Sequence, residues 1–421
     1  MEENKKSNEP RIDNIRAELE PSPMYNMSLS SKELFHSNLL AWLGNTQETK
    51  AFFVDIVDKL AGIKLDLNDS WTVEREDKNF DLCIKKGKDY LLVIENKVKS
   101  IPRKAQLDEY VGKIKKIGSS TVTKFMLLTL ANIFPHKKDI ETEEIWGIKT
   151  YKDLADSMDM NLLNQEYHKH LIQDYRGFIV NLNALVEEWQ QKDTFADTDS
   201  LEGLNKLSDL HAKIQFSSYC VKLREKISNI ERVAVYDKND NSDITEWIKK
   251  YGKNNIYIKV DWDFASRGKT GLIDIGIPVI NHNSPKIQKD CCTPDHVIKI
   301  QVEGRSYRHV IESWKNPQNL VSFGKENPYT NALKWFSEDP SKNCFDVNYG
   351  SDSIFNVGLY PESKQSLRNK DSWPFKSYKD KEGRICFIYQ SRNIKDTAAV
   401  DDVLNNIVNE VKRVLDTFEH E

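Results

Sequence analysis

The sequence predicts an α/β fold in which a mixed sheet with αβββαβ order is followed by a second α+β domain. The chain has 421 residues, more than one ordinary hydrophobic core holds, so two domains are expected. In the first half, short apolar runs of strand length stand between longer amphipathic segments, which is typical of a sheet covered by helices. The second half is richer in strand-like runs and closes with an amphipathic helix.

Capping residues define the helices at the start of the chain. One helix is expected to open at Ser30, to place Phe35 and Trp42 on its apolar side, and to end at Gly44. The next is expected to stop at Gly62, because glycine readily adopts the left-handed conformation that ends a helix. The predicted helices cover residues 11–20, within an N-terminal extension of residues 1–30, and residues 31–44 and 49–61.

Strand-length apolar runs follow these helices. The elements predicted here are strands over residues 71–77, 80–85 and 90–97, a helix over 103–117 and a strand over 124–130. A short turn rich in lysine separates the second strand from the third, which predicts a hairpin. With the preceding helix, these elements produce the αβββαβ order. Residues 150–190 are predicted to be helical.

An acidic, polar tract around residues 187–209 indicates a boundary between two domains. It separates a domain over residues 31–195 from one over residues 200–421, which we expect to serve targeting, regulation or dimerisation. The elements predicted for the second domain are a helix over 204–229, strands over 256–262, 270–277 and 296–302, and a helix over 397–418. Apolar residues recur along the closing helix at heptad-like spacing, at Val403, Ile407, Val411 and Leu415.

Composition excludes several classes of protein. No apolar run approaches roughly 18 residues and the N-terminus lacks an apolar signal segment, so we expect no membrane association and a cytoplasmic location. The scattered cysteines, including the adjacent Cys291 and Cys292, are expected to be reduced thiols. The net charge of −4 argues against a wholly basic nucleic-acid-binding protein, although residues 78–116 hold eleven Lys or Arg and only five Asp or Glu. That stretch either faces phosphates or forms a solvated surface.

The strand over residues 90–97 ends in a Glu-Asn-Lys sequence. Side chains two residues apart on a strand share a face, so Glu95 and Lys97 lie together. Asp81, on the preceding strand of the hairpin, brings a second carboxylate to the same patch. Charges at the end of a buried strand are costly to desolvate unless they are paired or hold an ion. We therefore predict that Asp81 and Glu95 bind Mg²⁺ or Mn²⁺, with Lys97 beside the water that attacks a phosphodiester. The alternative is a surface salt bridge between Glu95 and Lys97.

These residues make the chain resemble the PD-(D/E)XK nuclease superfamily, whose fold is that of many restriction endonucleases. The resemblance covers residues 31–130 and matches Asp81, Glu95 and Lys97 to the motif, with Phe80 in the place of the proline. It is strongest toward an uncharacterised bacterial branch with a Glu-Asn-Lys third strand. The resemblance implies a restriction-endonuclease-like core and a divalent-metal-dependent nuclease.

Two helical residues have roles that the resemblance implies. Glu33 resembles the upstream helical acid of the superfamily and would assist in holding the metal, whereas its spacing from Ser30 also fits a capping box. Gln106 resembles the helical glutamine that often follows the lysine. An ordinary exposed glutamine is the alternative for this position.

The interpretation that accounts for most of these features is an endonuclease that hydrolyses DNA with Mg²⁺, in a restriction or anti-phage defence setting suggested by analogy. A catalytically idle nucleic-acid-binding or regulatory protein on the same fold is one alternative, and an RNase is another, because no groove-reading motif separates DNA from RNA. One metal site cuts one strand, so a homodimer is expected for double-strand cleavage. The closing helix is the candidate interface, unless it packs on its own domain.

Overall fold

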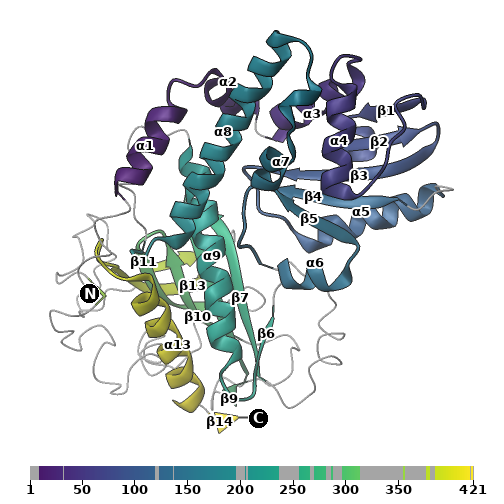
Figure 1. The fold of residues 1–421 in the computed structure, drawn as a ribbon. Coiled ribbons are helices and arrows are strands. Elements are labelled where there is room, and N and C mark those ends of the chain that lie inside the picture. The colour runs from purple at the N-terminus through teal and green to yellow at the C-terminus, as the bar shows by residue number, and fades with distance from the viewer. Residues whose placement is uncertain are drawn as a thin grey trace. The chain divides into compact units, whose positions relative to one another are not determined.

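The chain forms two compact units, each with its own sheet (Figure 1). The first unit comprises Met1–Gln191 with Thr198–Ser218, and the second comprises Lys192–Asp197 with Tyr219–Glu421. The computed structural model describes residues 9–31, 33–118, 123–135, 137–195, 204, 207–236, 256–265, 270–280, 286–287, 296–312, 354–355, 376–379, 385–417 and 419–420.

The sheet of the first unit is mixed, as predicted. Its strands are β1 (Trp71–Glu74), β2 (Leu82–Lys86), β3 (Asp89–Lys97), β4 (Lys124–Thr129) and β5 (Trp146–Thr150), in that spatial order. The first three strands pair antiparallel through short turns, and β4 and β5 then add in parallel. The parallel step from β3 to β4 needs a crossover, which the helix between them supplies. The αβββαβ core is confirmed, and β5 extends it by a strand that the sequence pattern did not predict.

Helices cover this sheet on both faces (Figure 1). The helices described in the first unit are α1 (Glu9–Leu19), α2 (Pro23–Ser31), α3 (Glu33–Asn45), α4 (Lys50–Ala61), α5 (Lys104–Ile117), α6 (Lys137–Glu143), α7 (Tyr151–Ser157) and α8 (Glu166–Gln191), with short 3-10 turns η1 (Asp77–Asn79) and η2 (Met160–Leu162). The N-terminal extension holds two helices rather than one. Its α1 contacts α8, where Arg11 pairs with the buried Glu188 at 2.9 Å.

Glycines have two different roles in these helices. Gly62 and Gly118 follow α4 and α5 with φ of 60° and 71°, so they are left-handed caps. Gly44 does not end α3 as predicted, because the helix continues to Asn45. A Cβ at Gly44 would lie 2.4 Å from Val73 Cγ2 and 2.9 Å from Phe53 Cε1, so this glycine permits α3 to approach β1 and α4 closely.

The substitution Gly44→Ala is expected to destabilise the first unit by about 1 to 3 kcal/mol, because the packed side chains around Gly44 must move to admit a methyl group. The matched control is Gly112→Ala in α5, where a Cβ meets nothing within 4 Å. That change should stabilise by roughly 0.5 to 1 kcal/mol through helix propensity alone. Urea denaturation of both variants measures the difference, and equal effects would contradict the close-packing explanation.

The described residues of the second unit form a nine-stranded sheet, a closing helix and the end of a helix that begins in the first unit, and the predicted α+β class is confirmed. Its strands are β6 (Val233–Tyr236), β7 (Ile256–Ala265), β8 (Thr270–Ile280), β9 (Lys286–Ile287), β10 (His296–Glu303), β11 (Ser306–Glu312), β12 (Lys376–Lys379), β13 (Ile385–Asn393) and β14 (Glu419–His420). The main path runs β12-β13-β11-β10-β8-β7-β6, with β9 and β14 at its side. The helix α9 (Ser208–Ser228) begins in the first unit and ends in the second, and α13 (Val400–Thr417) closes the chain.

The closing helix packs on its own unit. Val403, Ile407 and Val411 are 0% exposed, and Glu410 accepts hydrogen bonds from groups on β11. The apolar stripe that was the candidate dimer interface is therefore buried within the chain. The alternative weighed for this stripe, packing on its own domain, is the one that the structure shows.

The cysteines and the helix lengths bear on the expectations of reduced thiols and of no membrane-spanning segment. Among the described residues, Cys83 and Cys220 are buried free thiols, whereas Cys291 and Cys292 lie outside the described residues. No helix in the described ranges is both long and apolar enough to cross a membrane.

Candidate active site

The end of β3 gathers the acidic and basic groups that the sequence singled out. In the antiparallel hairpin Leu82 pairs with Ile94, so the next pair outward is Asp81 beside Glu95. Asp81 is held there because its Oδ2 accepts a hydrogen bond from the backbone N–H of Asn96 at 2.8 Å. Glu95 and Lys97 form an ion pair on the same face of the strand. The structure thus brings Asp81, Glu95 and Lys97 together.

Glu95 is the most deeply buried acid of this cluster. Its residue is 1% exposed, and within the described part of the chain neither carboxylate oxygen accepts a hydrogen bond of normal geometry. Burial, opposed by the charge of Lys97 and reinforced by that of Asp81, raises the pKa of Glu95 to about 7. Burial also raises the pKa of Asp81, against the hydrogen bond from Asn96. A buried acid beside a second, partly buried acid favours a shared proton or a bound cation.

Glu33 lies in the first turn of α3 and reaches the chain that follows β3. Its Oε1 accepts hydrogen bonds from the N–H of Lys99 at 3.0 Å, the hydroxyl of Ser100 at 2.8 Å and the N–H of Val98 at 3.3 Å. Burial raises the pKa of Glu33, but these hydrogen bonds and the charge of Lys97 lower it overall. The carboxylate therefore holds the loop after the Glu-Asn-Lys strand, and the Ser30 side chain of the capping-box alternative lies outside the described part.

Gln106 reaches the cluster through a neighbour on its own helix. Its Nε2 donates a hydrogen bond to the hydroxyl of Tyr110, one turn along α5, at 2.9 Å. Burial and the charges of Glu95 and Asp81 raise the pKa of Tyr110 to about 12. Tyr110 was noted in the sequence only as a residue on the stripe of Gln106, and it belongs with the site.

Asn96 is a second residue that the sequence reasoning missed. It stands between Glu95 and Lys97, so its side chain leaves the opposite face of the strand. There it meets Ser37 of α3 and Tyr151 of α7. Its position inside the motif was the signal available in the sequence, but no pattern rule identifies its partners, which lie 59 and 55 residues away.

The donor set fits a hard divalent cation. Carboxylate oxygens suit Mg²⁺ and Mn²⁺, and the buried carboxylate of Glu95, which pairs with Lys97, is the kind of ligand that a cation would stabilise. In the described part of the chain, no group of three or more His, Cys, Asp or Glu side chains is arranged to hold a metal. The fit therefore rests on the Asp81 and Glu95 pair, and a direct metal contact by Glu33 stays a prediction.

The lysine-rich turn before β3 is largely neutralised. Lys85 pairs with Glu74 at 3.0 Å and with Asp77 at 2.9 Å, and Lys86 pairs with Asp69 at 2.7 Å. These contacts favour the solvated-surface alternative for this part of residues 78–116, because the local acids already balance the lysines.

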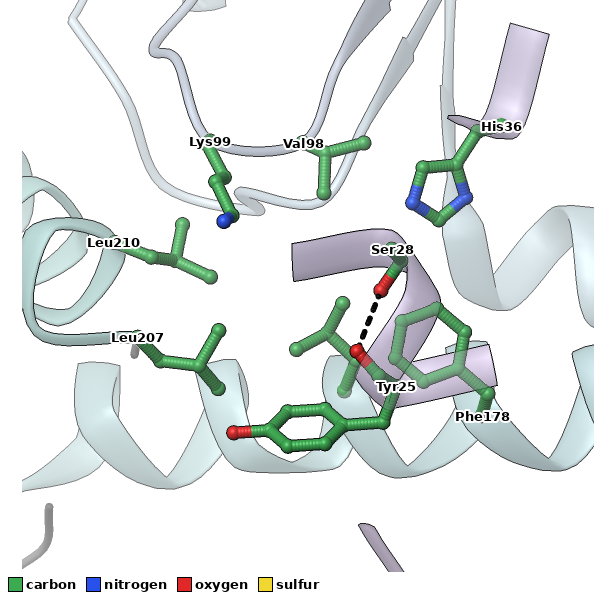
Figure 2. A pocket seen from close by; sticks show the side chains of 9 residues that line it. Tyr25, Ser28, His36, Val98, Lys99, Phe178, Leu207 and Leu210 are labelled. Carbon is green, nitrogen blue, oxygen red and sulfur yellow. Dashed lines mark hydrogen bonds between the residues drawn. The ribbon is translucent and has the colours of Figure 1, made fainter. Parts of the chain in front are cut away.

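A small pocket of the first unit lies beside residues 98–99, the loop that Glu33 holds. Its lining is mainly apolar and includes Tyr25, Phe178, Leu207 and Leu210 (Figure 2). None of Asp81, Glu95 and Lys97 lines it, so this pocket is separate from the acidic cluster.

The comparisons with known proteins agree with this geometry. A family model for the PD-(D/E)XK nuclease superfamily matches residues 24–267, more than half of the chain and far more than the residues 31–130 of the sequence resemblance. No curated protein matches the chain, and no solved structure does. With the motif residues gathered at one end of β3 and the family match extending into the second unit, the chain belongs to the PD-(D/E)XK nuclease superfamily.

Proposed function

We propose that this chain is a divalent-metal-dependent endonuclease that hydrolyses phosphodiester bonds of DNA. The observation that supports it most is the buried Glu95 next to the partly buried Asp81, with Lys97 beside it. Membership of a nuclease superfamily supports the reaction class. The choice of DNA, the metal and a role in restriction or anti-phage defence belong to the proposal.

Asp81 and Glu95 would hold the cation, Mg²⁺ or Mn²⁺, with Glu33 as the third predicted acid. When bound there, the ion would polarise the phosphate and lower the pKa of a water molecule. Asn96 keeps Asp81 in place through its N–H, so the carboxylate is oriented before any ligand arrives. Such preorganisation is what a phosphoryl-transfer site requires.

Lys97 would act on the water and on the phosphate. Its side chain is 11% exposed and its ammonium lies against Glu95, so it is aimed at the acids rather than into solvent. There it can orient a water molecule by hydrogen bonding and offset charge on the scissile phosphate. Tyr110, held by Gln106, would present a hydroxyl to the same patch.

An idle nucleic-acid-binding or regulatory protein is less consistent with this site. Two carboxylates at a phosphate-facing patch repel the ligand, and burying them costs stability that a pure binding module has no reason to sustain. An RNase on the same scaffold remains the alternative with identical chemistry. A homodimer stays part of the proposal for double-strand cleavage, through a surface other than the buried face of α13.

Incubation of the purified chain with plasmid, linear DNA, single-stranded DNA and RNA tests the proposal directly. We expect cleavage of DNA in Mg²⁺ or Mn²⁺ and none in EDTA, because the acids need the cation to approach a phosphate. Cleavage confined to RNA would support the RNase alternative. Binding of nucleic acid without cleavage, at any metal concentration, would support the idle alternative.

A further inference from the structure

The Asn96 side chain, which is not among the reacting groups, makes an unusually complete set of hydrogen bonds. Its residue is 1% exposed, and its Nδ2 donates to the backbone oxygen of Glu33 at 3.0 Å and to Ser37 Oγ at 3.1 Å. Its Oδ1 accepts a hydrogen bond from the hydroxyl of Tyr151. The backbone N–H of Asn96 donates to Asp81, so every polar group of Asn96 except its backbone carbonyl takes part in these contacts.

These contacts occur at the end of β3, beyond the last residue of β3 that pairs with β2. The β2–β3 ladder ends at Leu82 and Ile94, whereas β3 continues beside β4 until Lys97 pairs with Thr129. The three residues of the Glu-Asn-Lys sequence are therefore held by a strand on one side only. The bond from Asn96 N–H to Asp81 replaces the missing ladder on the other side.

The anchor extends into the helical layer. Tyr151 opens α7, which a capping box at Thr150 begins, and it is 1% exposed. Its ring lies 4.9 Å from the ring of His36, centroid to centroid, and His36 Nδ1 lies 2.8 Å from the hydroxyl of Tyr175. Because packed side chains of this kind have few alternative rotamers, Asn96 has little freedom to move.

We propose that Asn96 is a positioning residue, locked by Tyr151, that aims Asp81, Glu95 and Lys97 at one point and thereby sets the affinity for the divalent cation. Side chains alternate along a strand, so anchoring residue 96 on one face directs residues 95 and 97 to the other. The same amide group ties the first turn of α3, which bears Glu33, to the end of β3. This inference rests on the proposed function, since it concerns the same metal-binding acids.

The variants Tyr151→Phe and Tyr175→Phe form a matched pair. Each removes one buried hydroxyl from the same layer, but only Tyr151 bonds Asn96, whereas Tyr175 bonds His36. We expect both to lose similar stability, with urea unfolding midpoints lowered by similar amounts. Calorimetric titration of Mn²⁺ or Mg²⁺ should show binding weakened about 10- to 100-fold in Tyr151→Phe and unchanged, within about threefold, in Tyr175→Phe.

A second variant, Ser37→Ala, removes one of the two acceptors of Asn96 Nδ2 without touching the tyrosines. It should also lower the affinity for the divalent cation. If Tyr151→Phe does not fold, this variant by itself tests whether Asn96 sets that affinity. If the wild type binds metal and cleaves, and the folded Tyr151→Phe and Ser37→Ala variants bind metal with the same affinity as the wild type, this inference alone is overturned. A wild-type chain that binds neither ion would overturn the proposed function along with it.

Discussion

Substitution of Glu95 with glutamine is expected to abolish metal-dependent cleavage, with a loss of at least about 1,000-fold, or about 4 kcal/mol in the barrier. The change removes a charged ligand from the proposed cation site while keeping the shape of the side chain. The control is Glu109→Gln on α5, an exposed acid that pairs with Lys113 at 2.9 Å. Turnover of plasmid in Mg²⁺ measures the effect. Activity of Glu95→Gln equal to that of the control would remove Glu95 from the site.

The same substitution should increase the stability of the metal-free protein at high pH. Burial holds the pKa of Glu95 at about 7, above the usual 4.5, so folding favours its protonated form. A raised folded-state pKa means that the contribution of Glu95 to stability is fully present below about pH 4.5 and is lost as the pH rises through about 7. Glutamine does not titrate, so the variant avoids this loss.

At pH 8 in EDTA we therefore expect Glu95→Gln to unfold at higher urea concentration than the wild type, by about 1 to 3 kcal/mol. The advantage should shrink as the pH falls and vanish below about 4.5. An advantage independent of pH would show that the carboxylate is not the source of the cost. A loss of cleavage together with a gain in stability in Glu95→Gln would indicate a functional acid that is costly to bury, because loss of a structural ion pair would lower stability instead.

Substitution of Glu410 with glutamine is expected to destabilise the second unit by about 3 to 5 kcal/mol, the usual cost of breaking a buried charge pair. Glu410 Oε2 accepts hydrogen bonds from His309 Nε2 at 2.7 Å and from the Tyr307 hydroxyl at 2.6 Å. Hydrogen exchange of the β11 amides, with urea denaturation, measures the loss. The control, Asp402→Asn, removes the same charge from an exposed position of α13 and should cost less than about 1 kcal/mol.

The pH dependence of the Glu410 effect has the opposite sign to that of Glu95. Burial raises the pKa of Glu410, but the charge and hydrogen bonds of His309 and the hydrogen bond of Tyr307 lower it overall. A lowered pKa contributes stability above about pH 4.5 that is lost as the pH falls through the folded-state value. The difference between wild type and Glu410→Gln should therefore narrow in acid. A loss no larger than that of Asp402→Asn would contradict the buried-pair assignment.

Local pattern was sufficient for the αβββαβ core and for the convergence of Asp81, Glu95 and Lys97. Strand alternation places Glu95 and Lys97 on one face whatever surrounds them, and a short turn sets which residue of β2 meets Glu95. Gly62 ended a helix as predicted because a left-handed cap depends on residues near in sequence. Pattern alone did not separate the predicted metal site from a salt bridge between Glu95 and Lys97, and the resemblance to the nuclease superfamily favoured the metal site.

Long-range packing decided the features that the sequence left open or assigned differently. Gly44 looked like a helix stop, yet its role follows from Val73, which folding brings against it. The apolar stripe on α13 was compatible with a dimer interface or with a core, and the structure shows it buried within its own unit.

What the sequence by itself determined is the class of fold and the gathering of Asp81, Glu95 and Lys97 at one end of β3, since both follow from periodicity and spacing along the chain. Only the tertiary structure decided how those groups are held. The partners of Glu33 lie 65 to 67 residues away, and the helical-layer partners of Asn96 lie between 55 and 63 residues away. Such contacts form because buried polar groups must find hydrogen bonds wherever packing offers them, and no local rule specifies where that is.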